Sequence, residues 1–169
     1  AYAPQEDDPK QIIFNFWEDV ENEIIEAQDN NCMVLLELDG NAKLGSEHIK
    51  GDPHKCTPNG KILIEIIKRQ NLVVANALDI CKGIITRERI TIDGTEKSVI
   101  DFILIRSKLS EYLMNVVIGD DRMFTLHRYT GKEKRKVMSD HNWLFSKFCI
   151  HNDKHVGQVR KEIFQYKDE

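Results

Sequence analysis

SVIDFILI, residues 98–105, is an apolar stretch that contains a single acid, Asp101. Side chains of a strand point alternately to its two faces, so Asp101 shares one face with Val99, Ile103 and Ile105. Its neighbours on the other face are apolar as well. A carboxylate that is isolated in such surroundings costs several kcal/mol and normally becomes protonated. Asp101 therefore needs a specific partner.

Two kinds of partner fit this acid. Backbone amides or a surface arginine at the strand edge would satisfy it, and this structural alternative stays open. The other partner is an imidazole that the acid holds in one tautomer, so that the second ring nitrogen can act as a base. His141 is the candidate, because SDHN (139–142) stands directly in front of the apolar run 142–150. A histidine beside a strand is also often a satisfied structural residue.

The size and charge of the chain set general bounds. Its 169 residues, 41% of them hydrophobic, suffice for one domain with a real core. The net charge is −4, so attraction to nucleic acid must come from a local patch. The four cysteines have no paired spacing and predict reduced thiols in an intracellular protein of the nucleus or cytoplasm. No stretch predicts a membrane span or a signal peptide, and the start without a methionine suggests that an upstream part is missing.

Strand-like and helix-like segments alternate along the chain. Apolar residues at helical spacing predict a helix over residues 8–28, with Asp8 as its cap and Pro9 at its first position. Residues 32–39 predict a strand that is covered on both faces. The other expected elements are a helix at 60–71, a strand at 72–78, two strands joined around Asp93-Gly94 within 85–105, and strands at 115–120 and 142–150. This pattern indicates an α/β fold with some antiparallel pairing late in the chain.

Asp39 and Asn41 form a D-x-N pair where the strand of residues 32–39 ends. In α/β sheets, ligands tend to bind at this edge, which favours a functional role for the pair. Asp-Gly-Asn is also good turn chemistry, so a structural role is the alternative. None of these signals decides the function alone.

Taken in order, the motifs resemble those of one superfamily. YAP (2–4), DGNAKLG (39–45), SVIDFIL (98–104) and SDHN (139–142) follow one another as in endonuclease/exonuclease/phosphatase domains. More narrowly, they resemble the apurinic-type endonuclease domain of non-LTR (LINE-type) retrotransposons. Each motif alone is weak, and the resemblance rests on their order and spacing.

The resemblance implies a domain organisation. Residues 1–150 would be the C-terminal portion of such a domain, and residues 151–169 a helical tail or linker. The fold would be α/β, half of a four-layer sandwich with a mixed, largely antiparallel sheet flanked by helices. The superfamily carries an Asn and its main metal-binding Glu before the Tyr motif, so this chain would hold about half of the site. We therefore expect weak or absent activity of the chain alone, and a homodimer or another association through the exposed sheet face.

The resemblance also implies roles for five side chains in hydrolysis of a phosphodiester. His141 would act on the scissile phosphate or its attacking water, while Asp101 orients the ring. Asp39 and Asn41 would position the water and a phosphate oxygen. Tyr2 would hydrogen-bond the phosphate. Such positioning and charge stabilisation supply most of the catalysis in phosphoryl chemistry.

The implied cofactor is Mg²⁺ or Mn²⁺, with Asp140 near or on the metal, because such ions prefer oxygen ligands. The implied substrate is DNA, and a nick that leaves a 3′-hydroxyl would prime a linked reverse transcriptase domain. Two other functions stay open. One is a phosphoesterase of the same superfamily that acts on RNA, a phosphoinositide or a sphingolipid. The other is a non-catalytic binding or relic module.

One departure from the family pattern lies inside the D-x-N pair. The family has an aromatic residue between the acid and the amide, and this chain has Gly40. Glycine permits backbone conformations that are closed to phenylalanine, so we expect a different loop geometry with the same side-chain chemistry.

Basic residues gather shortly before the SDHN motif. Their position predicts contact with DNA phosphates, although a solvated loop is the alternative. They are Arg128, Lys132, Lys134, Arg135 and Lys136.

Overall fold

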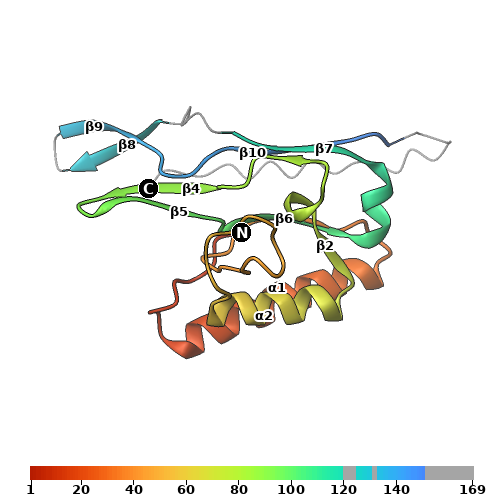
Figure 1. Ribbon diagram of the computed structural model, residues 1–169. Helices are drawn as coiled ribbons and strands as arrows, with labels where there is room; N and C mark the ends of the chain where they lie inside the picture. Colours follow the sequence, from red (N-terminus) through yellow and green to blue (C-terminus); the bar gives the residue numbers. More distant parts are fainter. Residues whose placement is uncertain (120–124, 131–132, 151–169) are drawn as a thin grey trace.

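The computed structural model describes residues 1–119, 125–130 and 133–150, with side chains described outside 120–138. This part of the chain forms three layers (Figure 1). Helices α1 (Lys10–Asp29) and α2 (Pro58–Arg69) cover one face of a three-stranded sheet. A second three-stranded sheet covers the other face. The predicted α/β class is confirmed.

The strand β6 (Asp101–Arg106) is the centre of the first sheet. It pairs antiparallel with β1 (Leu35–Asp39) on one side and with β2 (Leu72–Val74) on the other. The register sets Asp39 opposite Asp101 at the end of this ladder. Two acids therefore stand side by side where the first sheet ends.

Alternate residues of β6 fill two different cores. Phe102 and Leu104 pack among the apolar side chains of α1, α2 and β1, whereas Ile103 and Ile105 pack against the second sheet. All four side chains are fully buried. A strand that is apolar on both faces is what such a central position requires. Asp101 begins this strand, at the rim of the second core.

The remaining strands build the second sheet and two hairpins. In the second sheet, β7 (Leu113–Ile118) lies between β10 (Leu144–Phe148) and β3 (Cys81–Lys82). The hairpin β4–β5 turns at Ile92-Asp93, so Gly94 of the predicted Asp93-Gly94 pair already belongs to β5, opposite Thr91. The basic segment forms the hairpin β8–β9. The bounds are Arg87–Thr91 for β4, Gly94–Ser98 for β5, Thr125–Thr130 for β8 and Glu133–Met138 for β9, with 3-10 helices η1 (Ala75–Ala77) and η2 (Ser107–Tyr112) as connectors.

The prediction that residues 32–39 are covered on both faces is wrong. The buried residues Val34 and Leu38 face the helices, while Met33 is 57% and Leu35 44% exposed on the opposite face. The reason is position, because β1 is an edge strand, and Met33 and Leu35 line an open cavity together with Phe148 and Ile150. An apolar run in the sequence does not distinguish these cases.

Two local predictions also need correction. Asp8 does not cap α1, since its carboxylate accepts the N–H of Gln5 and the helix begins after Pro9 without a side-chain cap. The strand expected at 72–78 ends at Val74. Beyond it, the buried side chain of Asn76 donates to the carbonyl of Asp101 and accepts the N–H of Ile103. One side-chain amide thus replaces the strand ladder and holds the start of β6.

Gly40 follows β1 for a reason that differs from the expected one. Its φ does not lie in the left-handed region. Instead, its N–H donates to the carbonyl of Ile100 at 2.7 Å, and a Cβ here would lie 3.1 Å from the ring of Phe102. A side chain here would crowd the ring, which would have to shift by a few tenths of an ångström. Close packing against β6, and not backbone freedom, explains this glycine.

Within the described residues, no helix is both long and apolar enough to cross a membrane. The tail predicted at 151–169 lies outside the described residues.

Candidate active site

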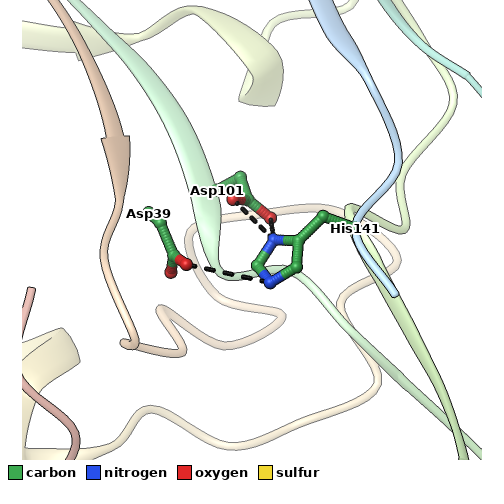
Figure 2. Close-up of side chains that lie close together, drawn as sticks. All are labelled: Asp39, Asp101 and His141. Carbon is green, nitrogen blue, oxygen red and sulfur yellow. Dashed lines mark hydrogen bonds and ion pairs between the residues drawn. The ribbon is translucent and has the colours of Figure 1, made fainter. Parts of the chain in front are cut away.

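Three side chains from distant parts of the sequence meet at one end of the first sheet (Figure 2). Asp39 comes from the end of β1, Asp101 from the start of β6, and His141 from the segment before β10. Nδ1 of His141 lies 3.0 and 3.1 Å from the two carboxylate oxygens of Asp101. Nε2 of the same ring lies 3.8 Å from Oδ2 of Asp39. The imidazole therefore stands between the two acids, and the predicted contact of Asp101 with His141 is present.

Thr86 ties these segments together. Its buried hydroxyl accepts the N–H groups of Ile100 and Asp101 at 3.0 and 3.1 Å. Its carbonyl accepts the N–H of Asn142 at 2.7 Å, directly after the histidine. One residue thus fixes the backbone on both sides of the acid–imidazole pair. No pattern in the sequence indicates this role, because a threonine at the start of a β-hairpin is ordinary.

The electrostatics of the pair follow from its burial and its charges. The hydrogen bond that Asp101 accepts from the ring, with the charges of the nearby carboxylates, raises the pKa of His141 against the opposing effect of burial. Burial raises the pKa of Asp39, and the negative charge of Asp101 adds to this effect. The side chains of Asp39 and Asp101 are only 16% and 18% exposed. The site thus concentrates more negative charge than its own residues neutralise.

The D-x-N pair has both the turn chemistry and the placement at the site. Oδ1 of Asp39 accepts the N–H of Asn41, which has a left-handed φ of 40°. The Asn41 amide donates to the carbonyl of Ala3 at 2.7 Å. Tyr2 forms a parallel bridge with Asp39, so the YAP motif lies against the end of β1. The turn leaves Oδ2 of Asp39 directed at the histidine.

Asp140 makes a contact that the sequence did not predict. Its Oδ2 accepts a hydrogen bond from Nε of Arg87 at 2.8 Å, and its Oδ1 lies 3.9 Å from Nε2 of His141. Partial burial acts to raise the pKa of Asp140, but the hydrogen bond and charge of Arg87 outweigh it and lower the pKa. The backbone next to Arg87 also bonds that of Asp140, since the N–H of Glu88 donates to the Asp140 carbonyl. Strand β4 therefore holds the segment with Asp140 in place beside its own Arg87.

An open cavity of about 370 Å³ lies over this cluster. Several of the predicted site residues line it together with two arginines of β4. These residues are Tyr2, Asp39, Asn41, His141, Arg87 and Arg89. A phosphate group has room to reach the ring nitrogen that faces Asp39.

The predicted DNA-binding residues are only partly described. Arg128 lies on β8, and Lys134, Arg135 and Lys136 lie on β9, with Arg128 opposite Arg135 in the register. Their side chains are not described, and Lys132 lies outside the described residues.

The cluster fits a divalent cation. One ligand atom from each of Asp39, Asp101 and His141 lies within 4.8 Å of the others. Both oxygens of Asp101 already accept from the imidazole, so Asp39 is the carboxylate with a free oxygen for an ion. The negative charge of Asp101 also raises the pKa of Asp39, which shows that the two acids repel each other. A bound cation would relieve this repulsion. This arrangement is compatible with a metal ion held partly by water.

Comparison with known proteins identifies the fold. No family model and no curated protein matches the chain. Among solved structures, the endonuclease domain of TRAS1, a telomere-specific non-LTR retrotransposon, superposes with a TM-score of 0.63 at 17% identity. Over the matched part, the chain therefore shares the fold of that domain. The match covers 88% of this chain and 55% of that one, so the chain spans about half the length of the TRAS1 domain.

The first prediction concerns the titration of His141. We expect its pKa, followed by NMR of the ring protons, to lie above the ordinary value of about 6.5. Asp101→Asn removes the charge that favours the imidazolium and should lower this pKa. The pairing stabilises the fold most below the unfolded pKa, and this contribution is lost as the pH rises through the folded pKa.

Asp93→Asn, in the exposed β4–β5 turn, is the matched control and should leave the titration of His141 in place. A wild-type pKa at or below the ordinary value, or one that Asp101→Asn does not lower, would contradict the proposed pairing.

Proposed function

We propose that this chain hydrolyses phosphodiester bonds of DNA with a divalent metal ion, Mg²⁺ or Mn²⁺, as a nicking endonuclease. The observation that carries the proposal is the imidazole held between Asp101 and Asp39 under an open cavity. The fold shared with a retrotransposon endonuclease domain supports it.

The chemistry begins with the orientation of the ring. Asp101 accepts from Nδ1, so in the neutral ring the proton stays on Nδ1 and the lone pair on Nε2 faces Asp39. The 3.8 Å between Nε2 and Oδ2 of Asp39 is too long for a good hydrogen bond. It is short enough for one water to bond both groups. In this arrangement, His141 takes a proton from that water as the water attacks phosphorus. The bond from phosphorus to the 3′-oxygen breaks, the phosphate stays on the 5′ end, and the departing 3′-oxygen takes a proton from solvent.

Other residues of the cavity would hold the substrate. Asn41 and Tyr2 would position the phosphate oxygens, since both line the cavity beside Asp39. A divalent ion bound at Asp39 would neutralise charge on the non-bridging oxygens. The raised pKa of His141 means that the basic form of the ring, and hence the rate, increases as the pH rises through that pKa.

The first test is nicking of supercoiled plasmid DNA in the presence of Mg²⁺ or Mn²⁺. We expect slow cleavage with protein in excess, and His141→Ala should reduce its rate about 10²-fold or more, the usual effect of a lost general base. His48→Ala is the control, because His48 is exposed and does not line the cavity. Equal rates for wild type and His141→Ala would refute the proposal.

The products and alternative substrates refine this test. If the nick leaves a 3′-hydroxyl, a DNA polymerase will extend it without further processing, as the proposed link to a reverse transcriptase requires. Parallel reactions with RNA, a phosphoinositide and a sphingolipid distinguish the other phosphoesterases of this fold. Cleavage of one of these in preference to DNA would overturn the DNA assignment.

We assign non-specific contact with the DNA backbone to the basic hairpin β8–β9. A triple neutralisation of Lys134, Arg135 and Lys136 to Gln should flatten the dependence of DNA affinity on salt, because each lost phosphate contact reduces the slope by about one. Binding of labelled duplex at several salt concentrations measures this slope. Neutralising the exposed Lys10, Lys50 and Lys108 is the control. An unchanged slope in the hairpin variant would show that the hairpin does not contact DNA.

We also propose that the chain associates through the open edge of β1. Among the described residues, the end of this edge alone is paired, by residues 1–3. Beside it lies a cavity of about 370 Å³ between β1 and α1. Apolar side chains dominate its lining, among them Phe16, Val20, Met33 and Leu35. An uncovered strand edge beside apolar surface favours pairing with another chain.

Sedimentation at several concentrations tests this association. Wild type should form a dimer as concentration rises, and Leu35→Glu should shift it toward the monomer. Ile92→Glu, on the fully exposed β4–β5 turn, is the control. A monomer at every concentration for wild type would contradict the proposed homodimer.

A further inference from the structure

We propose that Arg87 is a phosphate-binding residue of this site and that Asp140 positions it, in place of a role for Asp140 as a metal ligand. The inference rests on the proposed function, because it supposes a phosphodiester anion in the cavity. It starts from the contact between the two side chains, which nothing in the sequence motifs indicated.

The geometry leaves part of the guanidinium available. Arg87 uses Nε to bind Oδ2 of Asp140 at 2.8 Å. Among the described residues, its two terminal nitrogens have no hydrogen-bond acceptor, and the side chain is 27% exposed along the wall of the cavity. A guanidinium presents its donors in a rigid planar fork that matches two oxygens of a phosphate. Once Nε is fixed, the orientation of the terminal nitrogens is restricted as well.

The backbone fixes both partners in place. Arg87 and His141 form an antiparallel bridge, and Glu88 donates to the carbonyl of Asp140 at 2.7 Å. Arg87 therefore lies at the start of β4, the strand whose backbone also bonds Asp140 and His141. A rigid support of this kind lowers the entropy cost of binding an anion.

The charges of the site call for such a cation. Asp39, Asp101 and Asp140 all lie around the imidazole, and a phosphodiester adds a further negative charge. Of the cationic side chains described along the cavity wall, Lys43 is already paired with Glu96 at 3.5 Å and Arg89 is exposed. Arg87 is the one that a carboxylate anchors next to His141.

The same contact argues against Asp140 as a metal ligand. Its Oδ2 is occupied by Arg87, and a guanidinium at this distance repels a divalent cation. The charge of Arg87 also acts on Asp39, but without a direct hydrogen bond among the described residues, so an ion is repelled less on the Asp39 side of the ring. This reverses the role that the sequence motif assigns to Asp140.

Binding of a short fluorescein-labelled DNA duplex, measured by anisotropy in EDTA, tests Arg87 without cleavage. Arg87→Ala should weaken affinity about ten- to hundredfold, the effect of losing a charged hydrogen-bond partner. Arg89→Ala, two positions along the same strand and lining the same cavity, should weaken it less than about fivefold. Arg87→Lys keeps the charge without the fork and should lose an intermediate amount, which covers the case in which the alanine variant does not fold.

Two results would overturn the assignment of Arg87. One is a loss of affinity in both Arg87 variants no larger than that of Arg89→Ala. The other is a wild-type protein that does not bind the duplex. If wild type binds through Arg87 but leaves the duplex uncut with Mg²⁺ and Mn²⁺, the phosphate site stands and the proposed hydrolysis fails.

Binding of Mn²⁺ to the free protein, followed by electron paramagnetic resonance, tests the role of Asp140. Asp140→Asn should bind Mn²⁺ as wild type does, whereas Asp39→Asn should lose at least tenfold in affinity.

A second experiment follows the Nε–H proton of Arg87 in ¹⁵N spectra. This proton should exchange with water slowly in wild type and fast in Asp140→Ala, a change expected only if the acid holds the guanidinium. Loss of Mn²⁺ affinity in Asp140→Asn would return Asp140 to the metal and overturn its positioning role.

Discussion

The hydrogen bond between Nδ1 of His141 and the carboxylate of Asp101 determines what this site can do. It joins the first strand residue of β6 to a loop forty positions later, and Thr86 bonds the backbone on both sides of it. The pair sets which ring nitrogen carries the proton, and thereby which one faces Asp39 and the cavity. The orientation and the charge of the imidazole both follow from this one contact.

The strand that supplies Asp101 also holds the fold together. Its apolar residues stabilise the fold, whereas the acid at its start brings a half-buried negative charge beside Asp39. Residues 102–105 are fully buried in two cores, which fixes β6 rigidly between the helices and the second sheet. A rigid strand end gives Asp101 a defined position. The same register sets Asp39 opposite Asp101, where neighbouring negative charge and burial raise the pKa of Asp39. Sites of this kind sacrifice some stability for function, since the charges that bind a cation or polarise a water repel one another without one.

The sequence allowed the acid–imidazole pair to be predicted because Asp101 is chemically out of place in an apolar strand. The α/β class followed in the same way from strong periodic patterns. Other features depend on spatial neighbours that no local pattern reveals. The apolar run at 32–39 was expected to be covered on both faces, but its edge position leaves Leu35 exposed. Thr86 and Arg87 belong to a hairpin of ordinary polar composition, and their roles arise only from the loop that folds against them.

The tautomer of His141 tests this arrangement most directly. In ¹⁵N NMR spectra recorded above the pKa of the ring, the proton should reside on Nδ1 and Nε2 should be bare, and Asp101→Asn should shift the ring toward a mixture of both forms. A neutral ring protonated on Nε2 in the wild-type protein would contradict the account, because the nitrogen that faces Asp39 could then accept no proton from water.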